Sequence, residues 1–202
     1  MNDFIMAAIG MTTNNLINIA TEITQANISI VKNSIKSMSS GQLNWKVSKN
    51  TWNINEILAH LNEYSKHYHD TFLHKIENTR FKSSKEGFIS SPLGKAAWRA
   101  MKLGNANNIK RKFKSPKEYN PILSPNILKG NQINNFLNQQ KKLLHIIEKC
   151  TTVNIRRIKI PTSRSKVVRL RLGDALLFVV YHNERHVQQI INLKQNTCFP
   201  SK

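Results

Sequence analysis

Four long stretches of this chain carry apolar residues at intervals of three and four, and this spacing restricts the fold more than any other feature. Such spacing lines one face of an α-helix with apolar side chains, and that face must pack against another element. The four stretches cover about residues 13–38, 53–78, 126–150 and 173–195. Because only short or irregular segments join them, we predict an all-α fold in which the four helices form a bundle.

Local signals support two of the predicted helix starts. Thr12 or Thr13 can cap the first helix, because a threonine hydroxyl accepts a hydrogen bond from a free backbone N–H. Asn53 and Glu56 have the spacing of a capping box at the start of the second helix, with asparagine in place of the usual serine or threonine.

The connection between the second and third helices is a long irregular insertion, over Phe81–Pro125. Three prolines between residues 116 and 125 exclude a long helix there, although a short one fits residues 93–103. Such insertions in compact domains are often lids or partner-binding segments. Before the fourth helix, residues 151–172 alternate weakly, which indicates either an irregular basic loop or a basic β-hairpin that turns around residues 161–165.

The length of the chain, 202 residues, suits a single domain, 1–202, with enough chain to bury a core. No apolar run approaches the roughly 18 residues that a membrane-spanning helix needs, so we expect no membrane segment. The N-terminal segment MNDFIMAAIGMTT lacks the basic start and the cleavage site of a signal peptide. Cys150 and Cys198 lie far apart, and we expect them to be reduced thiols in a cytoplasmic protein, with a single disulfide as the alternative.

The chain is strongly basic, with 31 Lys and Arg against 11 Asp and Glu and a formal net charge of +20. This balance raises nucleic acid or another polyanion as a partner. The cations concentrate in Lys110–Lys117, Arg156–Lys159 and Arg164–Arg171, all in predicted loops. Phe113 alone interleaves the first group, whereas a surface for single strands stacks bases on several aromatic rings. We therefore favour solvated basic loops over a dedicated nucleic-acid site.

Two histidines of the fourth predicted helix, His182 and His186, stand four residues apart and hence one turn apart on nearly the same face. Val179 and Ile190 continue the same line, so both imidazoles occupy the row that should face the core. A buried imidazole must have its nitrogens satisfied, either by hydrogen bonds or by a metal ion. His60 lies on or beside the apolar face of the second helix.

Three neutral imidazoles from two helices would form a metal site with at least one open position, which is typical of catalytic rather than structural sites. Zinc, nickel and ferrous iron all accept nitrogen ligands, and the ligand set does not choose among them. The other histidines of the second helix, His67, His69 and His74, scatter around it. We expect those three at the surface or in ordinary hydrogen bonds.

Two zinc-protease patterns do not fit this helix. In H-E-x-x-H the residue after the first histidine is the general base, but here that position is Asn183. The acidic residue, Glu184, lies about 200° around the helix from His182 and is expected to point away from a metal. The inverted H-x-x-E-H pattern fails because Arg185 holds the acidic position.

Three segments carry a family resemblance: TWNINEILAHLNEY at the second helix, FKSPKEYNPILSP before the third, and LGDALLFVVYHNERHVQQI at the fourth. In order and spacing they cover roughly Leu43–Leu193, and they resemble the DinB-like superfamily, particularly its YfiT-like branch of metal-dependent hydrolases. The resemblance implies an up-down four-helix bundle and a metal ion held by His60, His182 and His186. Gln189 matches a glutamine frequent in the motif, which either supports a ligand or makes a capping or core hydrogen bond.

The resemblance also implies two reactions, hydrolysis of a small-molecule substrate or an S-transferase reaction of a low-molecular-weight thiol such as bacillithiol. No catalytic residue is assigned, because capping already accounts for Glu56 and Glu63 is expected to face solvent. Two alternatives stay open. One is a non-enzymatic protein whose basic loops bind nucleic acid or another polyanion, and the other is a bundle with a vestigial site. A homodimer would agree with the exposed helix faces of such bundles.

Overall fold

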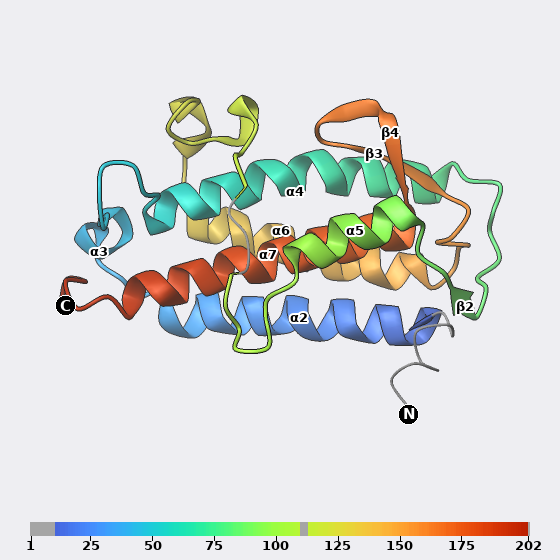
Figure 1. Cartoon of the computed structure of the whole chain (residues 1–202), viewed down its shortest axis with the longest axis horizontal. Coiled ribbons are helices and arrows are strands. Elements are labelled where there is room, and N and C mark those ends of the chain that lie inside the picture. The colour runs from blue at the N-terminus through green and yellow to red at the C-terminus, as the bar shows by residue number, and fades with distance from the viewer. Residues whose placement is uncertain (1–10, 110–112, 202) are drawn as a thin grey trace.

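Four long helices run along the molecule in a computed structural model that describes residues 11–109 and 113–201 (Figure 1). They are α2 (Thr13–Ser34), α4 (Ile54–Glu77), α6 (Gln132–Cys150) and α7 (Leu172–Lys194). The prediction of a mostly helical fold with long helices at these four places is confirmed. The N-terminal segment MNDFIMAAIG and residues 110–112 of the predicted basic cluster lie outside the described residues.

Two helix ends differ from the predicted ones. α2 ends at Ser34 rather than near residue 38, and a turn follows it. α6 begins at Gln132 rather than near residue 126, because Pro125–Leu128 forms the 3-10 turn η2 and Gly130 has a φ of 82°. That φ lies in the left-handed region, which glycine adopts readily and which ends a right-handed helix.

The start of α4 has the predicted capping box. The Asn53 side chain accepts a hydrogen bond from the Glu56 backbone N–H at 2.8 Å, and Glu56 Oε2 accepts one from the Asn53 N–H at 2.9 Å. The other oxygen of Glu56 pairs with Lys46 Nζ at 2.7 Å. Of the two threonines predicted to cap α2, Thr12 does so by accepting from the Asn15 N–H at 3.1 Å.

α4 and α6 run in the same direction. Asn62 Nδ2 donates to Gln132 Oε1 at 2.8 Å, and His69 Nδ1 bonds Gln139 Oε1 at 2.9 Å, two turns further along both helices. Consecutive helices of an up-down bundle alternate in direction, so this pair corrects the prediction at that point. The physical reason is the connection over residues 78–131, which returns the chain to the end of the bundle where α4 begins (Figure 1).

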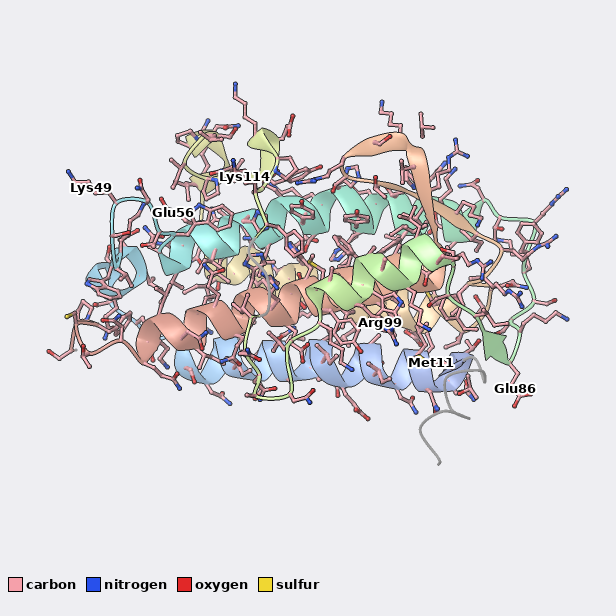
Figure 2. The ribbon with its side chains drawn as sticks, viewed as in Figure 1. Met11, Lys49, Glu56, Glu86, Arg99 and Lys114 are labelled. Carbon is pink, nitrogen blue, oxygen red and sulfur yellow. The ribbon has the colours of Figure 1, made fainter. Side chains whose placement is uncertain are left out.

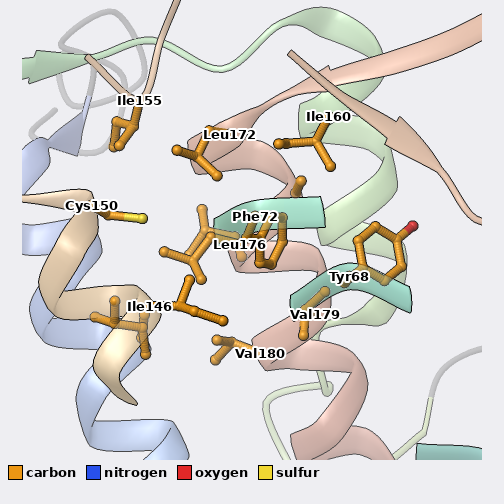
Figure 3. Packing of buried hydrophobic residues seen from close by; sticks show 14 of the residues in the cluster. Tyr68, Phe72, Ile146, Cys150, Ile155, Ile160, Leu172, Leu176, Val179 and Val180 are labelled. Carbon is orange, nitrogen blue, oxygen red and sulfur yellow. The ribbon is translucent and has the colours of Figure 1, made fainter. Parts of the chain in front are cut away.

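The apolar core has two parts that follow one another along the bundle. The larger part joins the start of α2, the second half of α4, the end of α6, the start of α7 and the segment before α7. It includes Tyr68, Phe72 and Leu176 (Figure 3). The smaller part joins the first half of α4 to the start of α6 and the end of α7, and it includes Ile57 and Ile190. Each of the long helices therefore contributes to a shared core, as a bundle requires.

The connection between α4 and α6 carries small elements that rest on the bundle. β2 (Gly87–Phe88) pairs antiparallel with β1 (Met11–Thr12), and α5 (Pro92–Met101) lies along α7 (Figure 1). The 3-10 turns η1 (Lys117–Tyr119) and η2 both contact α4. The predicted short helix is therefore α5. A further short helix, α3 (Ser40–Asn44), precedes α4.

The basic segment before α7 is a β-hairpin, which decides between the two predicted alternatives. β3 (Lys159–Thr162) and β4 (Ser165–Arg171) pair antiparallel. Ile160 and Leu170 are cross-strand partners and both are buried, so one face of the hairpin base packs on the larger part of the core. The cysteines are free thiols, as predicted. Within the described residues no helix combines the length and apolar character that crossing a membrane demands.

The buried carboxylate of Asp174 joins the start of α7 to the start of α5 through hydrogen bonds. Asp174 is fully buried, and its Oδ2 accepts hydrogen bonds from the Ser91 N–H at 3.0 Å and from the Ser91 hydroxyl at 3.1 Å. Ser91 Oγ also accepts from the Gly94 N–H at 3.0 Å, so the carboxylate lies at the N-terminus of α5, where the helix dipole favours negative charge. A Cβ on Gly94 would lie only 2.1 Å from the carboxylate carbon of Asp174.

Gly94→Ala is expected to destabilise the protein, although alanine is the better helix former by about 1 kcal/mol. Relief of the 2.1 Å contact requires a shift of Asp174 or α5, which we expect to lower the unfolding free energy by about 1–3 kcal/mol in urea denaturation. Gly87→Ala is the matched control, because no atom lies within 4 Å of a Cβ there. A Gly94→Ala protein as stable as wild type would contradict this packing of Asp174.

Candidate metal centre

Three histidines from two helices converge inside the bundle. His60 lies on α4, and His182 and His186 lie one turn apart on α7. Their ligand nitrogens all lie within 4.8 Å of one another, and the Nε2 atoms of His60 and His182 are 3.2 Å apart. His60 and His182 are buried, at 3% and 7% exposure, and His186 is partly buried. The three residues singled out in the sequence therefore meet at one point.

The apolar pattern of the two helices places the histidines there. On α4, His60 lies between Ile57, in the smaller part of the core, and Tyr64, in the larger part. On α7, the change from the larger to the smaller part occurs between Tyr181 and Val187. The histidines thus lie where the two parts of the core meet, and their imidazoles separate the apolar side chains of one part from those of the other.

His60 has a defined tautomer. Its Nδ1 lies 2.7 Å from the backbone carbonyl oxygen of Tyr119, in η1. Because a carbonyl oxygen only accepts, Nδ1 carries the hydrogen, and the lone pair of the neutral ring lies on Nε2. A hydrogen bond of this kind is typical of histidines that bind a metal through the other ring nitrogen.

His186 is held in the same way. Its Nδ1 lies 2.9 Å from Gln189 Oε1. An amide oxygen also only accepts, so the lone pair of neutral His186 lies on Nε2 as well. Gln189, for which we predicted support of a ligand or an ordinary hydrogen bond, thus bonds directly to one of the three histidines.

The three imidazoles are uncharged at neutral pH. Burial lowers the pKa of His60 to about 4, although the hydrogen bond to Tyr119 acts in the opposite direction. Burial also lowers the pKa values of His182 and His186 well below the ordinary value, and the neighbouring histidines add to this effect. Neutral imidazole is the form that binds a metal ion, so metal binding near pH 7 displaces no proton from these rings.

The separation of the closest nitrogens agrees with shared coordination. Two imidazole nitrogens bound to one tetrahedral zinc ion at about 2.05 Å lie about 3.3 Å apart. His60 Nε2 and His182 Nε2 are 3.2 Å apart. A hydrogen bond satisfies the same pair, with His182 Nε2–H donating to the lone pair of His60. With three protein ligands, a tetrahedral ion keeps one position open for water or substrate.

Aromatic rings lie against the histidines on several sides, from Trp52, Tyr64 and Phe178, and the Tyr119 ring lies beside Tyr64. The ring centroids of Trp52 and His60 are 4.9 Å apart, and those of Tyr64 and His182 are 4.6 Å apart. These rings exclude water and so keep the imidazoles neutral. Sequence reasoning assigned none of them to the site, because an aromatic residue at helical spacing has the same pattern as a core residue.

The long insertion forms part of this site. It supplies the Tyr119 carbonyl, and Ser115 Oγ lies 3.5 Å from His60 Nδ1. Figure 2 shows Lys114 on the side of α4 where the hairpin lies, and Arg164 of the hairpin turn donates to the Lys114 carbonyl at 2.8 Å. The insertion and the hairpin are therefore joined beside the histidines. That the insertion acts as a lid or a partner-binding segment stays a prediction.

The two carboxylates nearest to His60 in sequence have other partners. Glu56 takes part in the capping box, and Glu63 Oε1 pairs with Lys66 Nζ at 2.5 Å. Burial raises the pKa of Glu184, while Lys102 nearby opposes this rise. No carboxylate among the described residues joins the three-histidine group.

Arg185 is a buried cation beside the site that sequence reasoning missed. It is 5% exposed, and its guanidinium lies over the Phe113 ring, 5.4 Å from the centroid. One terminal nitrogen of this group has no hydrogen-bond partner among the described residues. Its charge contributes to the low pKa values of His182 and His186, and it favours negatively charged ligands nearby.

The unfolding free energy of the metal-free protein is expected to fall as the pH is lowered from 6.5 to 4. Burial lowers the pKa of His60 and of His69 to about 4, whereas histidines of the unfolded chain keep a value near 6.5. In this window the unfolded chain binds protons that the folded chain does not bind. Stability present above pH 6.5 is therefore lost on acidification, by up to about 3 kcal/mol for each group.

Urea denaturation between pH 4 and pH 8 measures this dependence. His69, which is buried and bonds Gln139, gives the matched variant away from the three-histidine group. His69→Gln is expected to reduce the slope of stability against pH below 6.5. The same slope in His69→Gln and wild type would contradict the role given to this residue.

Comparison with known proteins gives one family match. The family model of the DinB superfamily matches residues 24–190, a range that contains α4, α6 and all three histidines. No curated protein and no solved structure matched the chain. Because the family model covers most of the chain, this protein belongs to the DinB superfamily.

Proposed function

We propose that this protein is a metal-dependent enzyme of the YfiT-like branch, in which His60, His182 and His186 hold a divalent ion such as zinc, nickel or ferrous iron. One observation carries the proposal. The ligand nitrogens of the three histidines lie within 4.8 Å of one another, in surroundings that keep the rings neutral. The hydrogen bonds to Tyr119 and Gln189 support it, because they leave the Nε2 lone pairs of two rings free for a ligand role.

A divalent ion bound there supplies a Lewis acid that lowers the pKa of a water or thiol and polarises a carbonyl group. The chain itself orients the three ligands, excludes water with aromatic rings such as Trp52 and Tyr64, and places the charge of Arg185 nearby. These groups select the substrate and its orientation, and the positive charge favours an anionic substrate or thiol.

Of the two reactions implied by the family resemblance, thiol S-transfer agrees better with the residues around the histidines. Hydrolysis at zinc sites commonly uses a carboxylate that accepts a proton from the attacking water. Glu56 and Glu63 are paired with Lys46 and Lys66 instead. A thiol has an ordinary pKa of about 8.5 and becomes a thiolate near neutral pH beside a cation, so it needs no protein base.

We therefore propose a thiol S-transferase that uses a low-molecular-weight thiol of the bacillithiol type. The thiolate sulfur forms a bond to an electrophilic carbon of the small-molecule substrate, and the leaving group departs with its electron pair. Hydrolysis remains the second reaction to test. A homodimer and a cytoplasmic location rest on the sequence alone and stay predictions.

Metal loading tests the centre itself. We expect purified wild-type protein to bind about one zinc or nickel ion per chain in a titration followed by elemental analysis, and His182→Ala to lose stoichiometric binding. His145→Ala is the control, because His145 is exposed on α6 and pairs only at 3.7 Å with Glu148. Wild-type protein that cannot be loaded would overturn the enzyme proposal and leave the vestigial site or the polyanion-binding protein.

The same titration also tests the hydrogen bond between Gln189 and His186. Gln189→Leu removes the hydrogen-bond partner of His186 and is expected to weaken metal affinity by about 10- to 100-fold. Gln188→Leu is its matched control, because the Gln188 side chain bonds Asn192 on the exposed side of the same helix. Equal losses in the two variants would assign the effect to α7 as a whole rather than to the contact with His186.

Activity distinguishes the two reactions. With metal restored, we expect wild-type protein to conjugate bacillithiol to an alkyl halide at least roughly 100-fold faster than His182→Ala, as measured by mass spectrometry of the conjugate. The His145→Ala protein should match wild type. Thiol-independent release of an acid from an ester or amide would instead identify a hydrolase, and conjugation that is equally fast in His182→Ala would contradict a role for the centre.

A further inference from the structure

A second site is indicated at the end of the bundle where α4 ends and α7 begins, away from the three histidines (Figure 1). A hollow of about 620 Å³ lies there. Five of its lining residues are basic: Lys85 after α4, Arg156 and Arg157 before β3, Lys159 in β3, and Arg171 at the end of β4. No carboxylate is among the described residues that line it. Three chain segments thus bring five positive charges to one concave surface.

The positive charge in this hollow is not neutralised by neighbouring side chains. Each of the four ion pairs among the described residues lies elsewhere and includes none of the five cations. The acidic neighbour in sequence, Glu86, is exposed and projects outward at the end of the molecule (Figure 2). Like charges that share a hollow repel one another, and a bound anion removes that repulsion.

The hairpin places two of the cations directly opposite each other. Lys159 and Arg171 are antiparallel partners in β3 and β4, and the side chains of such partners project from the same face of the sheet. Like charges at this position destabilise a sheet. The Arg171 guanidinium also donates to the backbone carbonyl of Ile89, which holds it beside the hollow. An anion between the two side chains turns an unfavourable pair into a favourable one.

Further contacts hold the backbone of two arginines, and the side chain of one of them, before any ligand binds. Asn154 Oδ1 accepts hydrogen bonds from the backbone N–H of Arg156 at 3.1 Å and of Arg157 at 3.2 Å. The Arg157 guanidinium lies over the Phe81 ring, 5.3 Å from the centroid. The backbone of both arginines and the guanidinium of Arg157 are thus placed beforehand, which reduces the entropy that binding of an anion costs at these groups.

We infer that this hollow binds a small molecule through its phosphate group, held by the arginines and Lys159. Guanidinium groups bind phosphate through two parallel hydrogen bonds, and a lysine adds a compact charge. The volume lies within the roughly 300–1,000 Å³ of small-molecule sites. A nucleic-acid duplex instead follows cations spread along a surface, whereas these five converge. The inference does not depend on the proposed function, because it uses none of the three histidines.

Titration with inorganic pyrophosphate, followed by calorimetry near 0.15 M salt, tests the site. We expect saturable binding to one site, and at least about tenfold weaker binding by the double variant Arg156→Gln/Lys159→Gln. Both residues are exposed, and Lys159→Gln removes a like-charge pair, so the melting temperature should not fall. Lys32→Gln/Lys36→Gln is the matched control, because it removes two exposed cations at the other end of the bundle. Its affinity should stay within about twofold of wild type, since salt screens distant charges.

Two further arms distinguish binding in this hollow from binding at the metal centre and from attraction by the net charge. His182→Ala should leave the affinity for pyrophosphate unchanged, and a loss in that variant would assign the binding to the metal centre. The inference would be overturned if Arg156→Gln/Lys159→Gln and Lys32→Gln/Lys36→Gln weakened binding equally, or if binding did not saturate. Either result would assign the attraction to the overall charge of +20. If duplex DNA displaced pyrophosphate and its binding required Arg156 and Lys159, the ligand of the hollow would be a nucleic-acid backbone rather than a small molecule, and the inference would be wrong.

Discussion

The burial of uncharged imidazoles in the middle of the bundle is the constraint on which the rest of the structure depends. A buried polar group without a hydrogen bond costs about 2–7 kcal/mol, so each ring nitrogen needs a partner. His60 obtains one from the Tyr119 carbonyl, and His186 obtains one from Gln189. The apolar core continues on both sides of this level, in two parts. These two parts hold α4 and α7 in the register that brings the imidazoles together.

The buried polar side chains at the level of the histidines include one on α6. The Asn183 side chain is buried and donates to Gln140 Oε1 of α6 at 3.4 Å. A zinc protease has its general base at this position of the helix, but here the side chain is directed to a neighbouring helix. The site therefore combines three neutral imidazoles with aromatic rings and one buried arginine. No carboxylate among the described residues joins this group.

The long insertion determines both the topology and the surroundings of the site. It returns the chain to the end where α4 begins, which is why α4 and α6 run parallel. On its way it contributes the Tyr119 carbonyl to His60, and it meets the hairpin at Lys114. The hairpin in turn contributes Lys159 and Arg171 to the basic hollow at the far end of the bundle. The segments between the long helices thus supply the groups that distinguish this chain from a plain bundle.

Helical spacing determined the four long helices, the capping box at Asn53 and the core-facing positions of the three histidines, because these features depend on residues within a few turns of one another. Tertiary structure alone decided the direction of α6, the partner of His60, and the contact of the hairpin with the insertion at Lys114. Each of these joins segments that are distant in the chain, and local periodicity carries no information on such pairs. The carbonyl of Tyr119 is the strongest case. Every residue has a carbonyl group, so only the path of the chain could bring this one to the imidazole.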